Sequence, residues 1–426
     1  MEQKNIVATI YIKNGRAVPD PEHLDRSEDI LQIARMYNDT GIDKIVCFDL
    51  SDDEDEKQKN LLAIRAINRT IDTKTAGGGN IRRIEDVQDF LYAGCIEVVL
   101  NGAKQNTPQI LIEAAKRFGK EKMLVSMKNV DFLFKGKDII KDTVHELFIM
   151  NESMYPGLEN TTDVPYILRQ DKYDLDNIVG ELSSEQIRGI YGDFINDPET
   201  DIMNLKCELS DRGIKMDNFT ASLQWSDMKV NSDGLVPVVT QDYRTHEVLM
   251  VAYMNEEAFN ETIRIGKMTY YSRSRQELWT KGMTSGHIQY VKSLTADCDF
   301  DTILAKVSQV GVACHTGAKS CFFNNIIKKE YREKNPLSIL ETEYDSIVDI
   351  KKDTMDSSYT KHLFDRGMDR ILKKVGEEAT EMIIAAKNPG KEETKNEIAD
   401  FLYDLMILMV EKEITWEDVT RELAQR

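Results

Sequence analysis

The sequence has few cysteines, no long apolar run and no excess of positive charge. Its six cysteines are too few and too unevenly placed for a disulfide framework, which favours a reducing compartment. No apolar run reaches the roughly 18 residues of a membrane span, and the first residues show no secretory signal. The formal net charge of −19 argues against nucleic-acid binding, which normally needs a basic face. We therefore expect a cytoplasmic protein that binds neither membranes nor nucleic acid.

The chain length of 426 residues predicts two or three domains, at roughly 150 residues per domain. In residues 1–220, short apolar runs alternate with helical patterns. Strands are expected at 6–12 and 44–50, in a short stretch that ends at Gly77-Gly78-Gly79, and at 96–100 and 123–127; helices are expected at 27–40, 61–70, 84–93 and 109–118. This alternation predicts a parallel sheet, either a barrel or an open doubly wound fold. Residues 135–190 show no clear run of four further strands, so we expect a shortened domain.

Two segments of this first part, Thr75-Ala76-Gly77-Gly78-Gly79-Asn80 and Asn101-Gly102-Ala103, carry a resemblance. They are similar to the (β/α)8 cyclase subunit of imidazole-glycerol-phosphate synthase and its isomerase relative. The resemblance implies a barrel whose two segments hold a substrate phosphate through backbone N–H groups. It also implies catalytic aspartates at two positions where this chain has Tyr11 and Lys128. We therefore predict a degenerate barrel-like domain over residues 1–220, either a scaffold for folding and assembly or a residual phosphate binder.

Three aspartates alternate with other residues further along the chain. In an extended strand, Asp297, Asp299 and Asp301 would share one face and Cys298 would point to the other. Three carboxylates on one face repel one another unless a cation lies among them. All-oxygen ligation suits Mg²⁺ or another hard divalent ion. The alternative is an exposed acidic strand that binds no metal.

Three of the six cysteines belong to the same part of the chain. Cys298, Cys314 and Cys321 supply three thiolates, which suit Zn²⁺. Three protein ligands leave a fourth position open, and an open position is typical of a catalytic zinc site. The alternative is a set of buried free cysteines, which are common in proteins.

Residues 221–333 predict a compact, sheet-rich α+β domain, because short strands flank one helix at 256–265. Cationic side chains between the third strand and the aspartates can form an anion site within this acidic protein: Arg273, Arg275 and Lys281. A solvated surface is the alternative explanation for the arginines.

The motifs of this domain are similar to those of phosphoribosyl-AMP cyclohydrolase. They include Gly234-Leu235-Val236-Pro237, Tyr271-Ser272-Arg273-Ser274-Arg275, Ser285-Gly286-His287 and Cys314-His315-Thr316-Gly317. The resemblance implies hydrolysis between N1 and C6 of the adenine ring of phosphoribosyl-AMP, in a site completed across a homodimer. It implies zinc ligands at Cys298, Cys314 and Cys321, and magnesium ligands at Asp297, Asp299 and Asp301. Candidate proton-transfer residues are His287 and His315, and candidate ligands of the substrate's phosphate and ribose are Arg273, Arg275 and Lys281.

Residues 334–426 predict an all-α domain. We expect a linker or the start of the domain at 334–345, a helical run from about 358 to 386, a helix at 392–411 and another near 415. Residues three and four apart share a helix face, so two groups of carboxylates should gather: Glu377, Glu378 and Glu381 on one helix, and Glu397 and Asp400 on the next. Nearby apolar residues favour partly buried Mg²⁺ ligands over a solvated acidic surface.

The same stretch resembles phosphoribosyl-ATP pyrophosphatase of the all-α nucleoside-triphosphate pyrophosphohydrolase superfamily. The resemblance rests on Lys373-Lys374-Val375-Gly376-Glu377-Glu378 and Glu397-Ile398-Ala399-Asp400, with Asp404 where that family often has histidine. It implies Mg²⁺-dependent release of pyrophosphate, with Lys373 and Lys374 neutralising phosphate charge.

Together the resemblances imply a bifunctional, ATP-binding hydrolase of histidine biosynthesis. The C-terminal domain would convert phosphoribosyl-ATP to phosphoribosyl-AMP, and the middle domain would open the adenine ring by zinc-activated water. One alternative is a housecleaning pyrophosphatase for noncanonical nucleotides. The other is a non-catalytic, zinc-stabilised scaffold for pathway enzymes.

Overall fold

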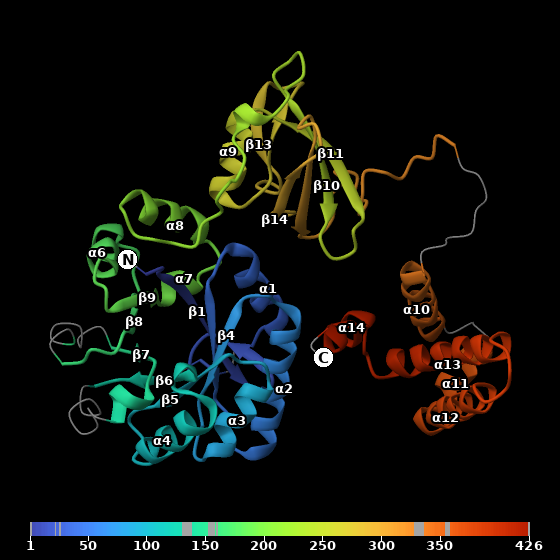
Figure 1. The fold of residues 1–426 in the computed structure, drawn as a ribbon, viewed down its shortest axis with the longest axis horizontal. Helices are drawn as coiled ribbons and strands as arrows, with labels where there is room; N and C mark the ends of the chain where they lie inside the picture. Colours follow the sequence, from blue (N-terminus) through green and yellow to red (C-terminus); the bar gives the residue numbers. More distant parts are fainter. Residues whose placement is uncertain are drawn as a thin grey trace. The chain divides into compact units, whose positions relative to one another are not determined.

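The computed structural model of the chain describes residues 2–21, 23–24, 27–129, 139–151, 158, 161–327, 336–353 and 358–424. The chain forms two compact units, Met1–Asn325 and Ile326–Arg426 (Figure 1). The first unit contains a barrel and a sheet-rich region, and the second is made of helices. The predicted multidomain fold class is therefore confirmed. The boundaries near residues 220 and 333 stay predictions.

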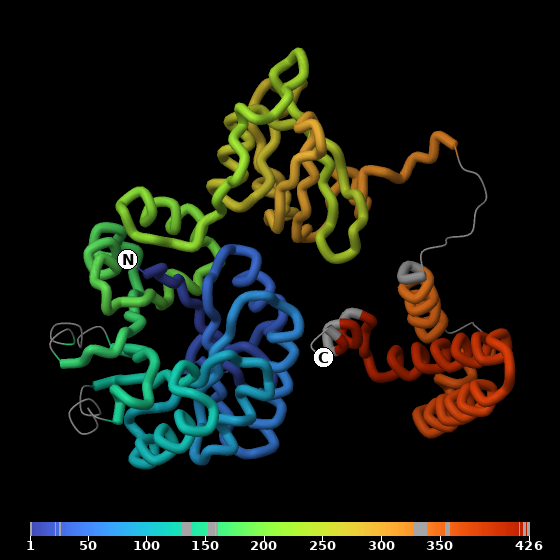
Figure 2. Tube along the Cα trace, viewed as in Figure 1, coloured from blue at the N-terminus to red at the C-terminus, as the bar shows by residue number. Residues whose placement is uncertain are grey.

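A nine-stranded sheet forms the barrel of the first unit. Eight parallel strands follow the order β1-β3-β4-β5-β6-β7-β8-β9, and β9 pairs with β1, which closes the ring of a (β/α)8 barrel. The short β2 is added antiparallel to β1. The strands are β1 (Asn5–Lys13), β2 (Arg16–Val18), β3 (Lys44–Asp49), β4 (Lys74–Gly78), β5 (Glu97–Asn101), β6 (Met123–Met127), β7 (Glu146–Ile149), β8 (Tyr166–Arg169) and β9 (Ile187–Tyr191). In Figure 2 the blue start of the chain accordingly passes close to the green segment that contains β9.

The helices of the barrel begin and end at local signals in the sequence. Asp29 accepts hydrogen bonds from the first backbone N–H groups of α1, and the helix ends at Gly41, whose φ of 95° is left-handed. Helix α2 begins before the expected Leu61, because Asp53 caps an acidic first turn. The described helices are α1 (Ile30–Thr40), α2 (Glu54–Thr70), α3 (Ile84–Tyr92), α4 (Thr107–Phe118), the 3-10 helix η1 (Lys120–Lys122), α6 (Leu175–Leu182), α7 (Asp193–Asn196) and α8 (Ile202–Asp211).

The second half of the barrel is compressed but contains its strands, which the sequence did not reveal. Strands β7 and β8 have only four residues each, and every residue of β7 is buried. A strand that is buried on both faces lacks the alternation of apolar and polar residues by which strands are recognised. Residues 130–138 and 152–157 of this half lie outside the described part of the chain.

A buried ion-pair network joins the N-terminal ends of three alternate strands. Lys44 Nζ at the start of β3 lies 2.6 Å from Glu97 Oε2 of β5 and 3.2 Å from Glu146 Oε2 of β7. Alternate strands of such a barrel contribute side chains to the same interior layer, and the N-terminal face usually serves stability. This network therefore belongs to the framework of the barrel.

The region after the barrel contains a four-stranded sheet in the order β11-β10-β15-β14 and a separate hairpin, β12-β13. Tyr270 joins the two parts, because its buried hydroxyl lies 2.8 Å from Thr240 Oγ1 and 2.8 Å from Gln289 Oε1. The elements are η3 (Trp225–Asp227), β10 (Val236–Asp242), β11 (Val248–Met254), α9 (Glu256–Ile265), β12 (Thr269–Ser272), β13 (Glu277–Thr280), β14 (Gln289–Ala296) and β15 (Ile303–Gln309).

The second unit is helical throughout its described residues, as predicted, with one difference in the helix boundaries. Residues 334–345 were expected to form a linker or the start of the domain, and the helix that begins at Pro336 agrees with the second alternative, since proline is favoured at a first helical position; residues 334 and 335 lie outside the described chain. The expected helical run to residue 386 is broken at Gly367, whose φ of 79° no α-helix accommodates. The helices are α10 (Pro336–Lys352), α11 (Tyr359–Arg366), α12 (Met368–Ala385), α13 (Glu392–Glu411) and α14 (Trp416–Ala424).

Across the described ranges, no helix combines the length and the apolar character needed to cross a membrane.

Candidate functional site

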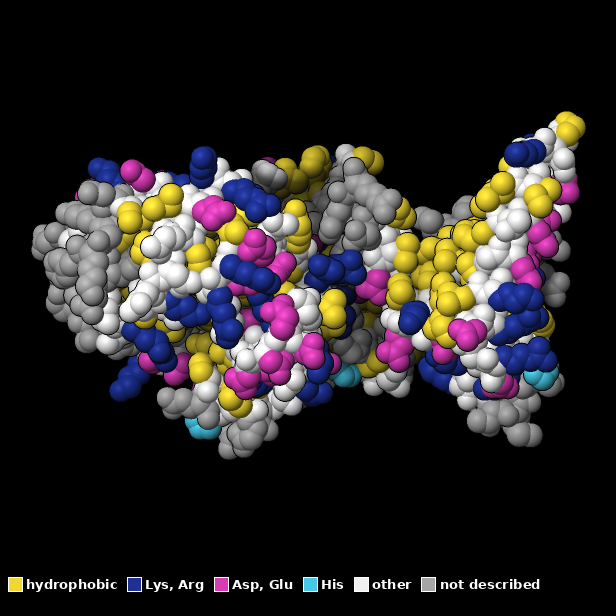
Figure 3. All heavy atoms as spheres, turned by 90° about the horizontal axis from the view of Figure 1, so that it is seen from below, with side chains coloured by type: hydrophobic (Ala, Val, Ile, Leu, Met, Phe, Trp, Pro, Cys, Tyr) yellow, Lys and Arg dark blue, Asp and Glu magenta, His cyan; other side chains and the backbone are white. Residues whose placement is uncertain are grey.

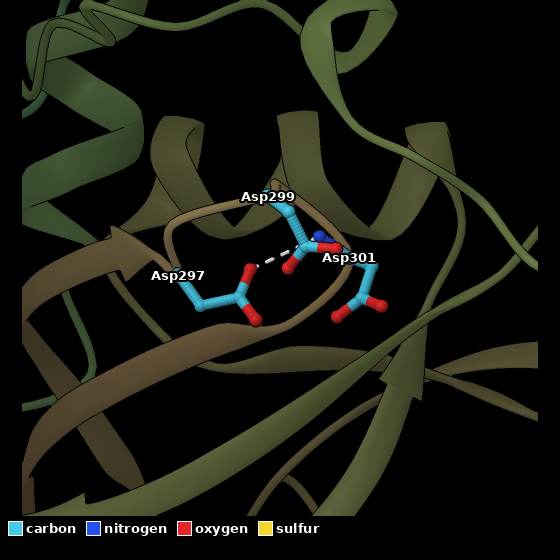
Figure 4. A group of neighbouring side chains, drawn as sticks. All are labelled: Asp297, Asp299 and Asp301. Carbon is cyan, nitrogen blue, oxygen red and sulfur yellow. Dashed lines mark hydrogen bonds between the residues drawn. The ribbon is translucent and has the colours of Figure 1, made fainter.

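The three aspartates lie in a loop that joins β14 to β15, not in the extended strand that we expected. The chain must reverse here between antiparallel strands, and Phe300 adopts a left-handed φ of 64°. Asp297 Oδ1 stabilises the turn by accepting the backbone N–H of Asp301 at 3.0 Å (Figure 4). It also accepts the backbone N–H of Thr302 at 3.2 Å. The strand prediction is therefore wrong at this point, because a tight loop replaces it.

The loop nevertheless brings the three carboxylates together, and we call residues 297–301 the aspartate loop. One oxygen from each of Asp297, Asp299 and Asp301 lies within 4.8 Å of the others, and all three residues are exposed. Lys229 Nζ, 3.5 Å from Asp299 Oδ2, is a cation beside the group. An all-oxygen, accessible donor set of this kind fits Mg²⁺.

The loop before and after Cys314 lies along the edge of β11. Cys321 N donates to Leu249 O at 2.8 Å, and Ser320 Oγ donates to Val248 O at 2.8 Å. The buried thiol of Cys314 lies 3.1 Å from Thr316 Oγ1, and this hydrogen bond is the main reason why the pKa of Cys314 is lowered. Burial of its sulfur raises the pKa of Cys321. Cys314 and Cys321 lie close enough for their thiols to interact.

The third predicted thiolate, Cys298, belongs to the aspartate loop and is exposed. Among the described residues of this chain, the sulfur atoms of Cys298, Cys314 and Cys321 do not all lie within 4.8 Å of one another. The sequence pattern does not reveal this separation, because it depends on how two loops are placed in space.

The two histidines have different surroundings. His315 Nδ1 lies 3.9 Å from Cys314 Sγ, which places the ring beside the thiol pair. The ring of His287 lies against Gly311, where an added Cβ would approach its Cδ2 to 2.8 Å. The carbonyl of His287 accepts a hydrogen bond from Gln309 Nε2 at 3.4 Å. His315 therefore lies beside the thiol pair, whereas the ring of His287 lies against the segment that leads to Cys314.

Two of the three candidate anion ligands lie in the turn between β12 and β13. The guanidinium carbon of Arg273 lies 3.9 Å from the centre of the Tyr253 ring, and Arg275 Nε lies 3.3 Å from Glu277 Oε1. Lys281 is placed differently, because its Nζ donates to the carbonyl of Ala313 at 2.5 Å, next to Cys314. Burial lowers the pKa of Lys281, and the two thiols nearby oppose that shift.

In the helical unit, carboxylates from α12 and α13 form the second group. One oxygen from each of Glu378, Glu381 and Glu397 lies within 4.8 Å of the others, and Glu378 is only 5% exposed. The pKa of Glu397 is raised, first by burial and then by the charges of Glu381, Asp400 and Glu378. Asp400 therefore lies near the group, whereas Glu377 pairs with Lys373 at 3.1 Å. Crowded carboxylates of this kind fit a divalent cation.

Lys374 and Asp404 complete the surroundings of this group. Lys374 Nζ forms a close ion pair with the buried Glu378, one turn further along α12. Asp404 is also buried, and burial raises its pKa to about 6. The sequence analysis did not select Asp404 as a site residue, although it lies one helical turn after Asp400 on the same face.

Tyr11, at one of the two positions where the resemblance implied a catalytic aspartate, begins a row of aromatic rings at the C-terminal end of the barrel. Tyr11 stacks on Phe48 with ring centres 5.5 Å apart, and Phe148 stacks on Tyr191 at 4.0 Å. Phe48 and Phe148 are 5.9 Å apart, so the four rings form a continuous row. Aromatic packing of this extent stabilises the end of the barrel.

The two segments expected to hold a phosphate do line one pocket of the barrel. The pocket has a volume of about 380 Å³ and includes Gly79, Asn80, Asn101 and Lys104. A Cβ on Gly79 would lie 2.2 Å from the carbonyl oxygen of Asp49, so this position requires glycine. Phosphate binding at this pocket stays a prediction.

Three family models match the chain in separate segments. Residues 5–147 match the model "Histidine biosynthesis protein", residues 250–323 match "Phosphoribosyl-AMP cyclohydrolase", and residues 342–426 match "Phosphoribosyl-ATP pyrophosphohydrolase". The aspartate loop and the cysteine pair fall in the second match, and the carboxylates of α12 and α13 fall in the third.

Curated relatives match about half of the chain over nearly their own full length. The histidine biosynthesis bifunctional protein HisIE of Thermoanaerobacter pseudethanolicus is 47% identical over 209 residues, which is 46% of this chain and 97% of that protein. HisIE of Bacillus subtilis is 43% identical over 203 residues, 48% of this chain and 96% of that protein. HisIE of Thermus thermophilus is 43% identical over 201 residues, 47% of this chain and 92% of that protein. The chain thus belongs to the family of histidine biosynthesis bifunctional proteins, with a phosphoribosyl-AMP cyclohydrolase domain and a phosphoribosyl-ATP pyrophosphohydrolase domain.

Proposed function

We propose that the two hydrolytic domains act in succession. The helical domain hydrolyses phosphoribosyl-ATP to phosphoribosyl-AMP and pyrophosphate, and the sheet-rich domain then opens the adenine ring of phosphoribosyl-AMP between N1 and C6. The observation that carries this proposal is the presence of two separate carboxylate groups, one in each matched segment. The order follows from the chemistry, because the product of the first reaction is the substrate of the second.

In the helical domain, the proposed Mg²⁺ ligands are Glu378, Glu381 and Glu397, with Asp400 near them. Glu377, the fifth predicted ligand, precedes Glu378 and pairs with Lys373. A bound Mg²⁺ would neutralise triphosphate charge and orient the attacking water. Lys374 holds the carboxylate of Glu378 in place through their ion pair. Lys373 pairs with the half-exposed Glu377, so its ammonium group can turn to a phosphate at little cost.

In the sheet-rich domain, the proposed zinc ligands are Cys298, Cys314 and Cys321, and the proposed magnesium ligands are the carboxylates of the aspartate loop. A bound Zn²⁺ would lower the pKa of a water molecule towards roughly 7 and supply a nucleophile at neutral pH. The Thr316 hydroxyl favours the thiolate of Cys314, and Lys281 holds the adjacent Ala313 carbonyl. His315, beside the thiol, and His287 are the proposed proton carriers, while Arg273 and Arg275 would bind phosphate or ribose.

We propose a homodimer in which Cys298 of one chain completes the zinc site of the other. The separation of Cys298 from the thiol pair in one chain supports this proposal. So do the exposed apolar side chains of Phe322 and Phe323, next to Cys321, and of Val251 on β11. Exposed apolar groups of this number beside a metal-binding loop favour a protein interface. Free thiols at a metal site also favour a reducing, cytoplasmic location.

The proposal is tested with phosphoribosyl-ATP and Mg²⁺, following pyrophosphate release and ring opening separately. The unmodified protein should give the ring-opened product. Cys314→Ala should release pyrophosphate and accumulate phosphoribosyl-AMP, whereas Glu378→Gln should leave phosphoribosyl-ATP intact yet still open the ring of added phosphoribosyl-AMP. Matched controls are Cys95→Ala, in the barrel core, and Glu392→Gln, in the exposed first turn of α13, which should retain both activities.

Three results would contradict the proposal in different ways. Pyrophosphate release without ring opening would make the cysteine site structural. Faster hydrolysis of noncanonical nucleoside triphosphates than of phosphoribosyl-ATP would favour a housecleaning pyrophosphatase. Stoichiometric zinc with no turnover would favour a scaffold.

A further inference from the structure

Asp39, near the end of α1 in the barrel, contacts two neighbouring strands of the sheet-rich region. Its Oδ1 lies 3.0 Å from Lys292 Nζ of β14, and its Oδ2 accepts the hydroxyl of Ser308 of β15 at 2.8 Å. The side chain of Asp39 is 11% exposed and that of Lys292 is 23% exposed. The largely buried carboxylate of Asp39 therefore contacts β14 with one oxygen and β15 with the other. Charge-assisted contacts shielded from water in this way are stronger than those on a surface.

Helix α8 of the barrel makes a second group of contacts with the same region. Asn204 Oδ1 accepts Arg264 Nη1 at 2.7 Å, and Asp201 Oδ2 lies 3.3 Å from Lys267 Nζ. The side chain of Met203 packs between Gly41, at the end of α1, and Gly266, at the end of α9. A Cβ on Gly41 would lie 2.5 Å from the Met203 sulfur, and a Cβ on Gly266 would lie 3.4 Å from the Met203 Cγ. The contact thus has an apolar part as well as ion pairs, and it involves α1 and α8 together.

Lys292 occupies a special position in its strand. Val291 pairs with Val307 and Ser293 pairs with Lys306, so Lys292 is the extra residue of a β-bulge. A bulge bends its strand, increases the local twist and redirects a side chain. The redirected side chain here reaches Asp39 and also lies 5.2 Å from the centre of the Tyr243 ring. The barrel therefore holds the hairpin at the point where its geometry is irregular.

The same hairpin carries the candidate metal ligands. Strands β14 and β15 are joined directly by the aspartate loop, and their pairing extends to Ala296 and Ile303 at the base of that loop. At the opposite end of the hairpin, Gln309 Oε1 accepts a hydrogen bond from Gln289 Nε2 at 2.8 Å, and Gln309 Nε2 donates to the carbonyl of His287 at 3.4 Å. A change in the twist of this hairpin would therefore move the aspartates and the His287 segment relative to each other.

We propose that Asp39 is a positioning residue for the cyclohydrolase domain, through which the barrel fixes the β14–β15 hairpin and the aspartate loop. The barrel then acts on the neighbouring reaction through contact, whatever ligand its own pocket holds. This inference rests on the proposed cyclohydrolase function, and its test separates the two. The barrel of the same chain thus covers the part of the sheet around Lys292 and Ser308.

The test compares Asp39→Asn, Asp39→Ala, Lys292→Met and the double variant Asp39→Ala/Lys292→Met in the full chain. Ring opening of phosphoribosyl-AMP should fall about 2- to 30-fold, the range found for residues that couple distant sites. Pyrophosphate release from phosphoribosyl-ATP in the same preparations should be unchanged. Amide hydrogen exchange should become faster in residues 289–309, and the double variant should be no worse than the worse single variant.

Two controls keep the inference falsifiable. Asp176→Asn removes an exposed ion pair with Arg212 elsewhere on the barrel, and it should change neither the rate of ring opening nor the hydrogen exchange in residues 289–309. Amide hydrogen exchange in β1 and β3 reports whether the barrel itself stays folded. Asp39→Asn preserves the shape of the side chain, so it tests the loss of charge alone. Unchanged ring opening and unchanged exchange in residues 289–309 for Asp39→Ala would overturn the inference. Absence of ring opening in the unmodified protein would overturn the proposed function instead, and the exchange data would still decide whether the barrel holds the hairpin.

Discussion

Arg273 lies with its guanidinium carbon 3.9 Å from the centre of the Tyr253 ring, so an aromatic side chain of β11 holds a cation of the β12–β13 turn. A cation–π contact of this kind contributes about 0.5–2 kcal/mol. We predict that Tyr253→Leu raises the KM for phosphoribosyl-AMP about 2- to 30-fold, because the arginine is no longer oriented. Tyr253→Phe keeps the ring and should have little effect. Equal KM values for the Leu variant and the unmodified protein would show that the stacking does not serve substrate binding.

The ion pair between Lys374 and Glu378 should matter more than the neighbouring one. Lys374→Met leaves the buried Glu378 carboxylate without its partner, which should cost the helical domain about 1–3 kcal/mol. Lys373→Met breaks a pair that solvent screens, so it should cost the domain much less than Lys374→Met. Hydrogen exchange in α12 and α13, measured in chelator, gives both values. Added Mg²⁺ should reduce the loss in Lys374→Met if Glu378 is a metal ligand, and no response to Mg²⁺ would argue against that assignment.

The buried Asp404 should make the helical domain sensitive to pH. Its pKa is raised to about 6, mainly by burial. The protonated Asp404 therefore stabilises the folded domain. This contribution to the free energy of unfolding is complete below the pKa of about 4 in the unfolded chain, and it is lost as the pH rises through about 6. In chelator near about pH 8, Asp404→Asn should therefore be more stable than the unmodified protein by about 1–2 kcal/mol, allowing for solvent screening.

This pH effect has a matched control. The gain in Asp404→Asn should appear as slower hydrogen exchange in α13 and should disappear on acidification to about pH 4. Asp349→Asn replaces an exposed aspartate of α10 and should show no such dependence. A gain that is the same at both pH values would mean that the charge of Asp404 is not its cause.

A zinc site shared between two chains makes a prediction about mixed variants. Cys298→Ala and Cys314→Ala should each lack ring-opening activity. When the two variants are mixed and allowed to exchange subunits, half of the dimers combine one chain of each kind, and one of their two sites is intact. Activity should return to about a quarter of the unmodified level. The absence of any recovery, with subunit exchange demonstrated, would place all three thiolates in one chain.

The barrel should depend on its interior ion pairs. Lys44→Met leaves Glu97 and Glu146 buried without their cation, which should destabilise the barrel by about 3–5 kcal/mol. Burial already raises the pKa of Glu146, so the loss should be smaller near about pH 5 than near pH 8, where the carboxylate must stay charged. Arg212→Met, which breaks an exposed pair with Asp176, should cost about 0–1 kcal/mol. Exchange in β3 and β5 measures both.

Local signals explain which elements the sequence predicted well. Helix α9 was expected at 256–265 and has those limits, because Asn255 caps its start and Gly266 adopts a left-handed φ of 67° at its end. Helix α13 likewise agrees with the prediction. Strands β7, β8 and β9 were missed, because short strands that are buried along almost all of their length show no alternation, and their identity depends on pairing with distant strands.

The sequence by itself predicted which carboxylates gather into two candidate metal-binding groups. The spacing of Asp297, Asp299 and Asp301 and that of Glu378 and Glu381 brought carboxylates together, although the first group lies in a turn and not in a strand. Only the tertiary structure decided that Cys298 lies apart from Cys314 and Cys321, and that Asp39 reaches the bulge at Lys292. Spacing along a helix or loop is a local property, whereas these relationships depend on how separate loops and folds pack. Packing of that kind is set by long-range contacts that no short stretch of sequence encodes.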